Sequence, residues 1–465
     1  MFKSDTFKNE KTDIKYQNSA NINNATTESE KNIALGSPSS QPEFGDIDKS
    51  KENTNTQLDR SIPPPDGLYS WLVVVAACFC YMNIFGGITV SGILQEYYLN
   101  TMFPNTPAAT ISWINTISFT LGYMGGIFAG PLVSYVGIRY VTLLAAVIST
   151  VGLLLASFCS EIWQLVLTQG VIYGFGSSLL INLSVTMATL WLVKHRSLAL
   201  GIIASGGGFG GLILAPAMRK TLPALGIHWT FRVLAFLNLL SGLFCFAIYK
   251  ERGPFNPIRR IIDFKLLKRP ITIFICLAAF FNQYGMSLIV LYFPATIADI
   301  GQTRATAANT ALIYSAIGGF GRILANILSK RVGNNNTLLF SSFGSCILIF
   351  SMWLPSRNFT VYLIFISFFA LLFPMAFPLI TALVSNNYKN EEILLANGLM
   401  FFFYGLSALC GVPIMGLLFD RLGHRQNFSP VIVSGGIIYF INFSLFLALR
   451  YYVKKYDPSL KIGRI

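Results

Sequence analysis

Residues 191–211 read WLVKHRSLALGIIASGGGFGG, a basic cluster followed by an apolar run and a group of glycines. Three of these glycines are spaced G-x-G-x-x-G, a pattern that cradles phosphates where a strand meets a helix in a nucleotide-binding domain. Here they lie well inside an apolar segment, residues 198–218, so the match is accidental. Lys194 and Arg196, just upstream, are expected at the cytoplasmic end of that segment, where they help to set its orientation.

The same glycines suit a membrane helix. A helix face without side chains lets a neighbouring helix approach closely and slide. The spacing G-x-x-x-G, which favours such packing, occurs at Gly206 with Gly210 and at Gly207 with Gly211. We therefore expect this stretch to form the packing surface of a moving helix that does not contact substrate.

The composition indicates a membrane setting for most of the chain. Of the 465 residues, 53% are hydrophobic and only 12% are charged, and the mean hydropathy is +0.58. Soluble domains carry about 25% charged residues. Apolar segments of about 20 residues can cross a bilayer as helices, which satisfy their own backbone hydrogen bonds. The sequence predicts an all-α polytopic membrane protein with twelve transmembrane helices, at 71–95, 111–135, 140–158, 164–192, 198–218, 230–249, 271–296, 306–329, 337–354, 359–385, 395–419 and 430–453.

These segments fall into two sets of six around a charged loop. We expect six-helix halves at 66–250 and 270–453, joined by a cytoplasmic loop at 251–269. Residues 1–65 are rich in Asn, Ser, Thr and Lys, which predicts a disordered cytoplasmic tail. Residues 454–465 are expected to form a short cytoplasmic tail at the other end.

Basic residues are distributed unevenly between the two sides. The loops and tail ends on the side of the N-terminus carry eighteen Lys and Arg residues outside the first 65 residues, against seven on or near the opposite side. The positive-inside rule then places both termini in the cytoplasm. The net charge of +14 is thus explained by topology and contact with anionic lipid, in preference to nucleic-acid binding.

No motif for catalysis, metal binding or a cofactor occurs in the sequence. The seven cysteines contain no CxxC pair and stand in apolar segments, which is typical of small core residues. The three histidines fall at the ends of segments, and there is no HExxH pair, nucleophile elbow or Walker loop. We therefore expect no enzymatic activity, no metal site and no cofactor.

Two loop segments resemble the motif G-x-x-x-D-R-x-G that follows the second and eighth helices of major facilitator carriers. GPLVSYVG (130–137) keeps both glycines but has Ser-Tyr in place of Asp-Arg, and NILSKRVG (326–333) keeps the Arg and the last glycine. A gating ion pair that usually involves this Asp is then absent or rebuilt. The resemblance implies two parallel six-helix halves with a substrate site near the midplane between them.

Further stretches resemble the monocarboxylate transporter family. PPDGLYSW (64–71) is similar to the family's D-G-G-x-G-W at the start of the first helix, and weaker similarities occur in DFKLLKRP (263–270), NGL (397–399) and GVPIMGLLFD (411–420). The opening stretch resembles the family's Y-F-x-K-R-R-x-L-A-x-G-x-A-x-A-G-x-x-x-G, with matches at Lys194, Arg196, Leu198, Ala199, Gly201, Gly206 and Gly210. The polar N-terminal tail is similar to the fungal branch, which includes carriers of other metabolites, riboflavin among them.

Arg322 is the charged residue that lies deepest in a predicted span. It stands about seven residues, or about 10 Å, from the cytoplasmic end of the segment 306–329. Such a side chain either snorkels to the interface or faces a cavity and meets an anionic or carbonyl-bearing substrate. The family resemblance implies an Arg here that contacts a substrate carboxylate and pairs with an Asp one turn earlier. That earlier position holds Gly318, and Gly86 stands where the animal lactate carriers have a Lys, so the resemblance does not extend to the proton-handling residues.

Uncharged polar residues near midspan are further candidates. Each either forms hydrogen bonds between helices or contacts substrate. Three consecutive polar side chains at 282–284 occupy most of a helix circumference, so at least one should face the cavity. The expected substrate-binding set is Arg322, Asn282, Gln283, Tyr284, Asn83, Asn182 and Tyr404.

These features predict a transporter that moves a small organic solute, a carboxylate or another planar metabolite such as a vitamin, by alternating access. Its partners are then the solute and the lipid bilayer, with proton coupling left open and a monomer as the transport unit. A non-transporting nutrient sensor on the same fold is the alternative, although the short C-terminal tail leaves little room for a signalling domain. We expect the protein in the plasma membrane, with a vacuolar or other internal membrane as the alternative.

Overall fold

The computed structural model describes residues 65–251 and 259–460, apart from eight side chains within the helices. The described residues form helices and no strands. The predictions for the N-terminal tail, for residues 252–258 of the central loop and for the last five residues therefore lie outside the described residues.

The helices form two groups along the chain, which we call the N-terminal half (65–251) and the C-terminal half (259–460). The N-terminal half contains α2 (Leu68–Tyr97), α3 (Ala108–Met124), α4 (Ala129–Val136), α5 (Ile138–Ala156), α6 (Ile162–Leu165), α7 (Tyr173–Trp191) and α8 (Arg196–Ile248). The C-terminal half contains α9 (Phe264–Leu267), α10 (Pro270–Asp299), α11 (Arg304–Val332), α12 (Asn334–Leu348), α13 (Phe359–Leu372), α14 (Ala376–Asn387), α15 (Asn390–Leu417) and α16 (Ser429–Lys455).

Short π-helical or 3-10 turns continue several of these helices, so that α3 with α4, α6 with α7, and α13 with α14 each form one membrane span. The turns are η1 (Tyr98–Met102), η2 (Gly125–Phe128), η3 (Val166–Ile172), η4 (Ile349–Trp353), η5 (Phe373–Met375) and η6 (Leu418–Leu422).

The predicted twelve spans are confirmed, with one difference in the loops. Eleven continuous segments of the described chain are long and apolar enough to cross a membrane. One of them, α8, has 53 residues and accounts for two of the twelve spans. Its two arms, 196–225 and 227–248, meet at Gly226, which has φ 77° and ψ 173°. The sequence had suggested a loop at 219–229, but one glycine is enough to turn the chain, because it has no Cβ to clash at positive φ.

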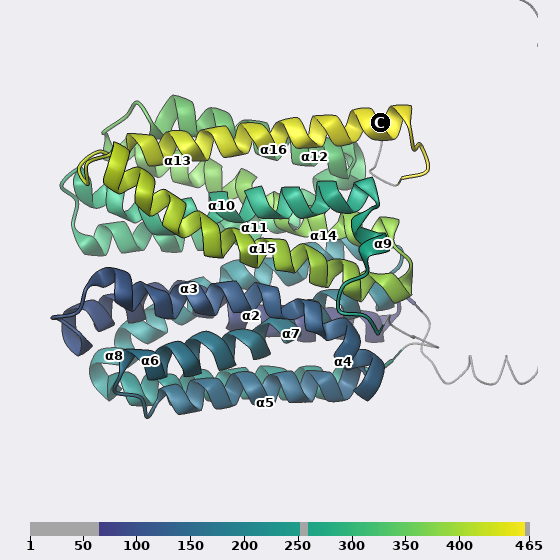
Figure 1. The fold of residues 1–465 in the computed structure, drawn as a ribbon, viewed down its shortest axis with the longest axis horizontal. Coiled ribbons are helices and arrows are strands. Elements are labelled where there is room, and N and C mark those ends of the chain that lie inside the picture. The colour runs from purple at the N-terminus through teal and green to yellow at the C-terminus, as the bar shows by residue number, and fades with distance from the viewer. Residues whose placement is uncertain (1–64, 252–258, 461–465) are drawn as a thin grey trace, which may run out of the picture. The chain divides into compact units, whose positions relative to one another are not determined.

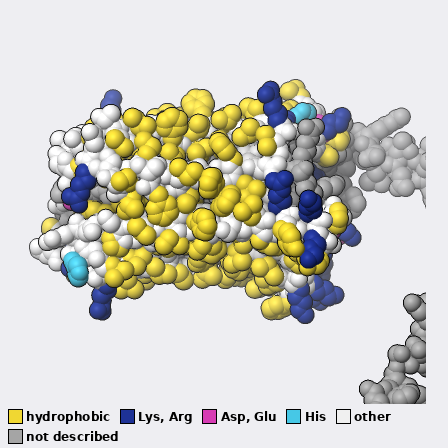
Figure 2. Space-filling model, turned by 90° about the horizontal axis from the view of Figure 1, so that it is seen from above, with side chains coloured by type: hydrophobic (Ala, Val, Ile, Leu, Met, Phe, Trp, Pro, Cys, Tyr) yellow, Lys and Arg dark blue, Asp and Glu magenta, His cyan; other side chains and the backbone are white. Residues whose placement is uncertain are grey.

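The outer surface has the pattern of a membrane-spanning bundle. Figure 2 shows a broad hydrophobic band, with Lys and Arg side chains gathered towards the two ends. Large apolar side chains of the described helices are exposed, among them Phe236, Phe320 and Phe340. Such exposure is the arrangement expected where lipid replaces water around the helices.

The two halves lie side by side, and the axes of their long helices are roughly parallel (Figure 1). Across the boundary, the first arm of α8 packs against α11, and α3 packs against α15. Within the N-terminal half, α2 makes its most extensive packing with α8. The boundary between the halves is therefore formed by α3, the first arm of α8, α11 and α15.

Candidate functional site

A central cavity of about 790 Å³ lies between the two halves. Its wall is formed by α2 and α3, by the first arm of α8, and by α10, α11 and α15. The lining extends from Arg322 near the middle of the bundle to Leu99 and Asn100 in η1. Because Asn100 is exposed and η1 follows the C-terminal end of α2, the cavity opens on the side opposite the start of α2.

Arg322 lies at the deep end of this cavity. It projects from α11, and one guanidinium nitrogen lies 3.7 Å from the point where a Cβ at Gly207 of α8 would stand. Tyr314 on the same helix and Tyr123 on α3 interact with it electrostatically, and both line the cavity. No acidic side chain of the described residues pairs with Arg322. The deep wall thus offers one guanidinium beside two phenols.

Gln283 is the member of the polar run on α10 that lines the cavity. Its side chain is 5% exposed. The neighbouring residues point elsewhere: the Asn282 amide donates to the Tyr404 hydroxyl at 3.4 Å, and the Tyr284 hydroxyl lies 3.1 Å from that of Ser434 on α16. One face of α10 therefore reaches the cavity and the others pack against α15 and α16.

The mouth of the cavity carries amide and hydroxyl groups that sequence reasoning did not single out. The Asn115 side-chain amide on α3 donates to the side-chain oxygen Oε1 of Gln95 on α2 at 2.9 Å, and Gln95 Nε2 donates to the Ser112 hydroxyl at 3.1 Å. Arg219 on α8 donates to Asn309 on α11 at 3.1 Å, which joins the two halves at this end. The clustering of Ser112, Asn115 and Thr116 on the first turns of α3 is a signal that could have marked this region.

Aromatic rings close the path below the cavity. We call Phe85, Tyr123, Phe377, Phe401 and Tyr404 the aromatic floor; the first two belong to the N-terminal half and the others to the C-terminal half. Across the boundary, the Tyr123 and Tyr404 rings are stacked with centroids 5.6 Å apart, and the Phe85 and Phe377 centroids are 5.9 Å apart. Phe401 and Tyr404 are almost fully buried. These rings seal the cavity from the closed end of the bundle.

Polar contacts hold the halves together beyond the aromatic floor. The Arg196 guanidinium on α8 donates to the Ser385 carbonyl at 2.8 Å. The Asn182 amide on α7 donates to the carbonyls of Gly126, at 2.7 Å, and Leu394, at 3.3 Å. Asn182 is therefore placed at the closed end and away from the cavity, where it bridges the two halves.

The glycines of the opening stretch pack α8 on three sides. A Cβ at Gly206 would lie 2.5 Å from the Cys78 carbonyl oxygen on α2, and one at Gly210 would collide with the Met82 carbonyl. A Cβ at Gly208 would lie 2.6 Å from the Ser315 carbonyl oxygen on α11. Gly207 faces Phe85 and the cavity, while Gly211 is buried. The α8 backbone thus touches both α2 and α11.

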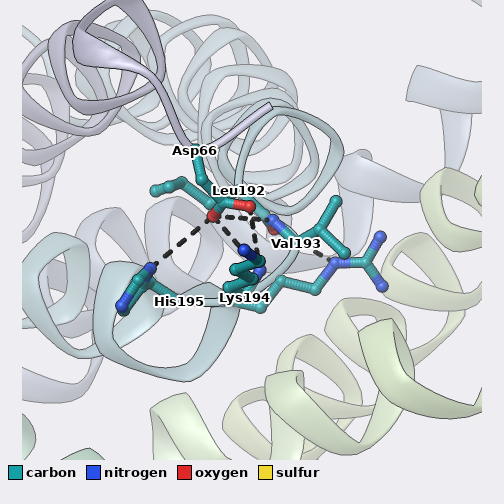
Figure 3. Close-up of polar contacts among 6 residues, drawn as sticks. Asp66, Leu192, Val193, Lys194 and His195 are labelled. Carbon is teal, nitrogen blue, oxygen red and sulfur yellow. Dashed lines mark hydrogen bonds and ion pairs between the residues drawn. The ribbon is translucent and has the colours of Figure 1, made fainter. Parts of the chain in front are cut away.

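Asp66 connects the start of α2 to the loop before α8 (Figure 3). Its carboxylate accepts hydrogen bonds from the backbone amides of Val193 at 3.2 Å and Lys194 at 3.1 Å, and it lies 3.7 Å from His195 Nδ1. Desolvation opposes ionisation of this carboxyl, but the amides of Lys194, Val193 and His195 favour the charged form and lower the pKa of Asp66 below 3.8. The side chain of Lys194 remains exposed, so its backbone is the part that takes part in this contact.

Replacing Asp66 by Ala is expected to lower the stability of the folded protein by about 1 kcal/mol, as loss of a capping carboxylate does. The folded pKa lies below 3.8, so the contribution is complete above that pH and is lost as the pH falls through the folded value. Thermal unfolding of the two proteins in detergent, compared over a pH series, measures the difference. Asp66→Asn, which tolerates the positive φ of 61° and keeps an acceptor, should lose less; equal stability of wild type and Asp66→Ala at neutral pH would contradict this role.

Asn83, the remaining candidate, donates to the Phe79 carbonyl one turn earlier on its own helix, at 3.0 Å. It does not belong to the described lining of the cavity. Of the seven predicted substrate-binding residues, Arg322 and Gln283 are brought together on the cavity wall. Tyr123 and Tyr314 also line this wall. The sequence did not identify them, because a single tyrosine in an apolar span is equally typical of core packing.

Comparison with known proteins places the chain among transporters. A family model described as Major Facilitator Superfamily matches residues 70–274 and 275–463. An MFS-type transporter of Gibberella moniliformis is 29% identical over 392 residues, which cover 83% of this chain and 92% of that protein. The agnestins efflux protein AgnL12 of Paecilomyces divaricatus is 26% identical over 377 residues, which cover 80% and 86% respectively.

A solved structure shares the fold. The proton:xylose symporter XylE, bound to 6-bromo-6-deoxy-D-glucose, superimposes with a TM-score of 0.67 at 16% identity, over 85% of this chain and 98% of the symporter. At that identity the likeness concerns the fold alone. The match of the family model over most of the chain agrees with the twelve spans and the cavity between two halves: the chain belongs to the major facilitator superfamily and is a multi-pass membrane transporter.

Proposed function

We propose that the protein is a secondary carrier for an organic anion with a planar or aromatic body, a substrate class in keeping with its resemblance to the monocarboxylate transporter family. The observation that carries this proposal is the Arg322 guanidinium at the deep end of a cavity between the halves. A guanidinium can donate two parallel hydrogen bonds to a carboxylate. A charged side chain inside a membrane span is costly, and its presence is explained if an anionic substrate binds to it.

The other groups on the wall favour a substrate with a ring. Tyr123, Tyr314 and Phe119 line the same cavity as Arg322. Aromatic side chains bury large apolar area and stack on planar ligands at low entropic cost. The cavity volume of about 790 Å³ lies in the range of sites for drug-sized molecules, which exceeds what the smallest monocarboxylates need.

Alternating access follows from the way the cavity is closed. We propose that the side with Arg196 and Asn182 faces the cytoplasm, as the charge distribution predicts, so that the structure represents an outward-open state. Inward opening then requires the aromatic floor and the contact of Arg196 with Ser385 to part. Gln283, Asn282 and Tyr404 are proposed to contact the substrate as it passes the floor.

We propose the plasma membrane as the location, a monomer as the transport unit, and six-helix halves at 66–250 and 270–453. In the outward-open state, Asn83 and Tyr284 are assigned to helix packing through their contacts with Phe79 and Ser434.

Ligand-induced stabilisation of the purified protein tests the proposed substrate class. Phenylpyruvate, an aromatic carboxylate, is expected to raise the unfolding temperature, since a ligand at a hundredfold excess over its Kd stabilises the folded state by about 2.7 kcal/mol. The matched control is phenylacetone, the neutral compound that has the same ring and ketone but no carboxylate, which should have little effect. Equal stabilisation by the two compounds, or none by either, would overturn the assignment of an anion site.

A further inference from the structure

Charged side chains are sparse on the described wall of the central cavity. Arg322 lies at its deep end, and Arg219 and Glu96 lie towards the mouth. Arg219 is engaged with Asn309, and the Glu96 side chain is exposed. The deep part of the wall therefore carries a single positive charge.

Phenols and small or apolar groups surround Arg322. Tyr314 on α11 and Tyr123 on α3 are the titratable groups that act on it. The helices packed against it present Phe85 from α2 and Gly207 from α8. Gly318 occupies the position one turn earlier on α11, where the family resemblance implies an Asp that pairs with the Arg.

Acidic residues of the chain occur elsewhere. Every Asp and Glu between residues 65 and 460 lies at the end of a helix or between helices. The three histidines are likewise at helix ends. The middle of the bundle thus holds the Arg322 charge together with phenols, amides and hydroxyls.

A carrier couples its substrate to a proton through a group that gains or loses the proton in the working pH range and that senses the substrate. Phenols titrate near pH 10 and guanidinium groups above about pH 12, so the groups at the deep end keep their charges throughout a transport cycle. We propose that the carrier moves its organic anion without a compensating proton, so that each turnover transfers net negative charge across the membrane. This inference rests on the proposed function, because it needs an anion bound at Arg322.

The membrane potential then drives transport. A potential of about 100 mV displaces the equilibrium distribution of a univalent anion about 50-fold. Cell membranes are negative inside, so the favoured movement is from the cytoplasm outward. Electrogenic transport at this site thus assigns the carrier to the export of organic anions.

Proteoliposomes loaded with radiolabelled phenylpyruvate and potassium test this inference. Valinomycin with a potassium gradient sets an inside-negative potential, and protein-free liposomes give the leak. We expect efflux to accelerate with the potential and the final distribution to shift about 50-fold for about 100 mV. The rate should stay constant between about pH 6 and about pH 8, and a trapped pH dye should record no proton movement with the flux.

The variant Gly318→Asp tests the same inference by adding a titratable group near Arg322. It places a carboxylate one turn before Arg322, so flux should become dependent on pH and less dependent on potential. A Cβ at this position lies 3.3 Å from the Pro374 ring, a contact that a small shift relieves, and Gly318→Asn is the matched neutral control. Folded Gly318→Asp protein with the pH response of Gly318→Asn would count against the inference.

The outcomes for the wild-type protein separate the two proposals. Phenylpyruvate flux that is insensitive to potential and accompanied by proton movement would overturn electrogenic export and leave the proposed anion site in place. A wild-type protein that carries no phenylpyruvate above the leak would overturn both.

Discussion

Replacing Arg322 by Gln is expected to abolish transport of phenylpyruvate and to remove the stabilisation that this compound gives. Loss of one partner from a buried, hydrogen-bonded charge pair costs about 2–5 kcal/mol, which corresponds to a loss of affinity of about 30-fold or more. Uptake into proteoliposomes and the ligand-dependent unfolding temperature measure the two effects. The free protein should fold normally, because the described structure gives Arg322 no acidic partner to leave behind.

Two further variants test whether the loss of binding and transport is specific to the Arg322 guanidinium. Arg322→Lys keeps the charge but loses the planar fork, so it should bind weakly and should not restore full transport. Arg219→Gln removes a cation at the mouth of the same cavity, where its partner is Asn309, and should retain most of the stabilisation by phenylpyruvate. An Arg322→Gln protein that transports phenylpyruvate at the wild-type rate would remove this residue from the site.

Replacing Gly210 by Val is expected to prevent formation of the folded protein. A Cβ at Gly210 would collide with the backbone of Met82 on α2, and a Cβ at Gly86 would lie 2.7 Å from the Gly210 backbone in return. Backbone atoms of two packed helices have no rotamer with which to relieve such a contact, so the cost is about 3 kcal/mol or more. Size-exclusion chromatography of the detergent-solubilised protein and its unfolding temperature report the effect.

Gly122→Ala is the control for helix propensity. Gly122 also stands within a membrane span, on α3, but nothing lies within 4 Å of its added Cβ. Alanine is a better helix former than glycine, so this variant should fold at least as well as the wild type. A Gly210→Val protein as stable as Gly122→Ala would show that α2 and α8 are not in backbone contact.

The number and approximate position of the spans were readable from the sequence because lipid demands long apolar helices. The turn between the fifth and sixth spans was harder to place. The predicted spans end at residue 218 and resume at residue 230, yet the chain stays helical up to Gly226. A single residue at positive φ makes this turn, and hydropathy does not register it.

The candidate site was readable only in part. Arg322 stood out because a charge deep in a span has few explanations, and the structure places it on the cavity wall. Asn182 gave the same signal as a substrate-binding amide, but its partners are the carbonyls of Gly126 and Leu394. Which face of a helix meets the cavity depends on contacts between segments far apart in the chain, so the sequence alone does not separate the two roles.

The contact between α8 and α11 has a consequence for the speed of transport. At Gly201 and Gly208 these helices meet through backbone atoms: a Cβ at Gly201 would lie 2.8 Å from the Arg322 carbonyl oxygen, and one at Gly208 would lie 2.6 Å from that of Ser315. Beside these backbone contacts, the Phe209 ring of α8 and the Phe320 ring of α11 meet edge to face with centroids 5.3 Å apart. We therefore expect the kinetic barrier between the two proposed states to include the separation of ring pairs at both places, at the aromatic floor and between α8 and α11.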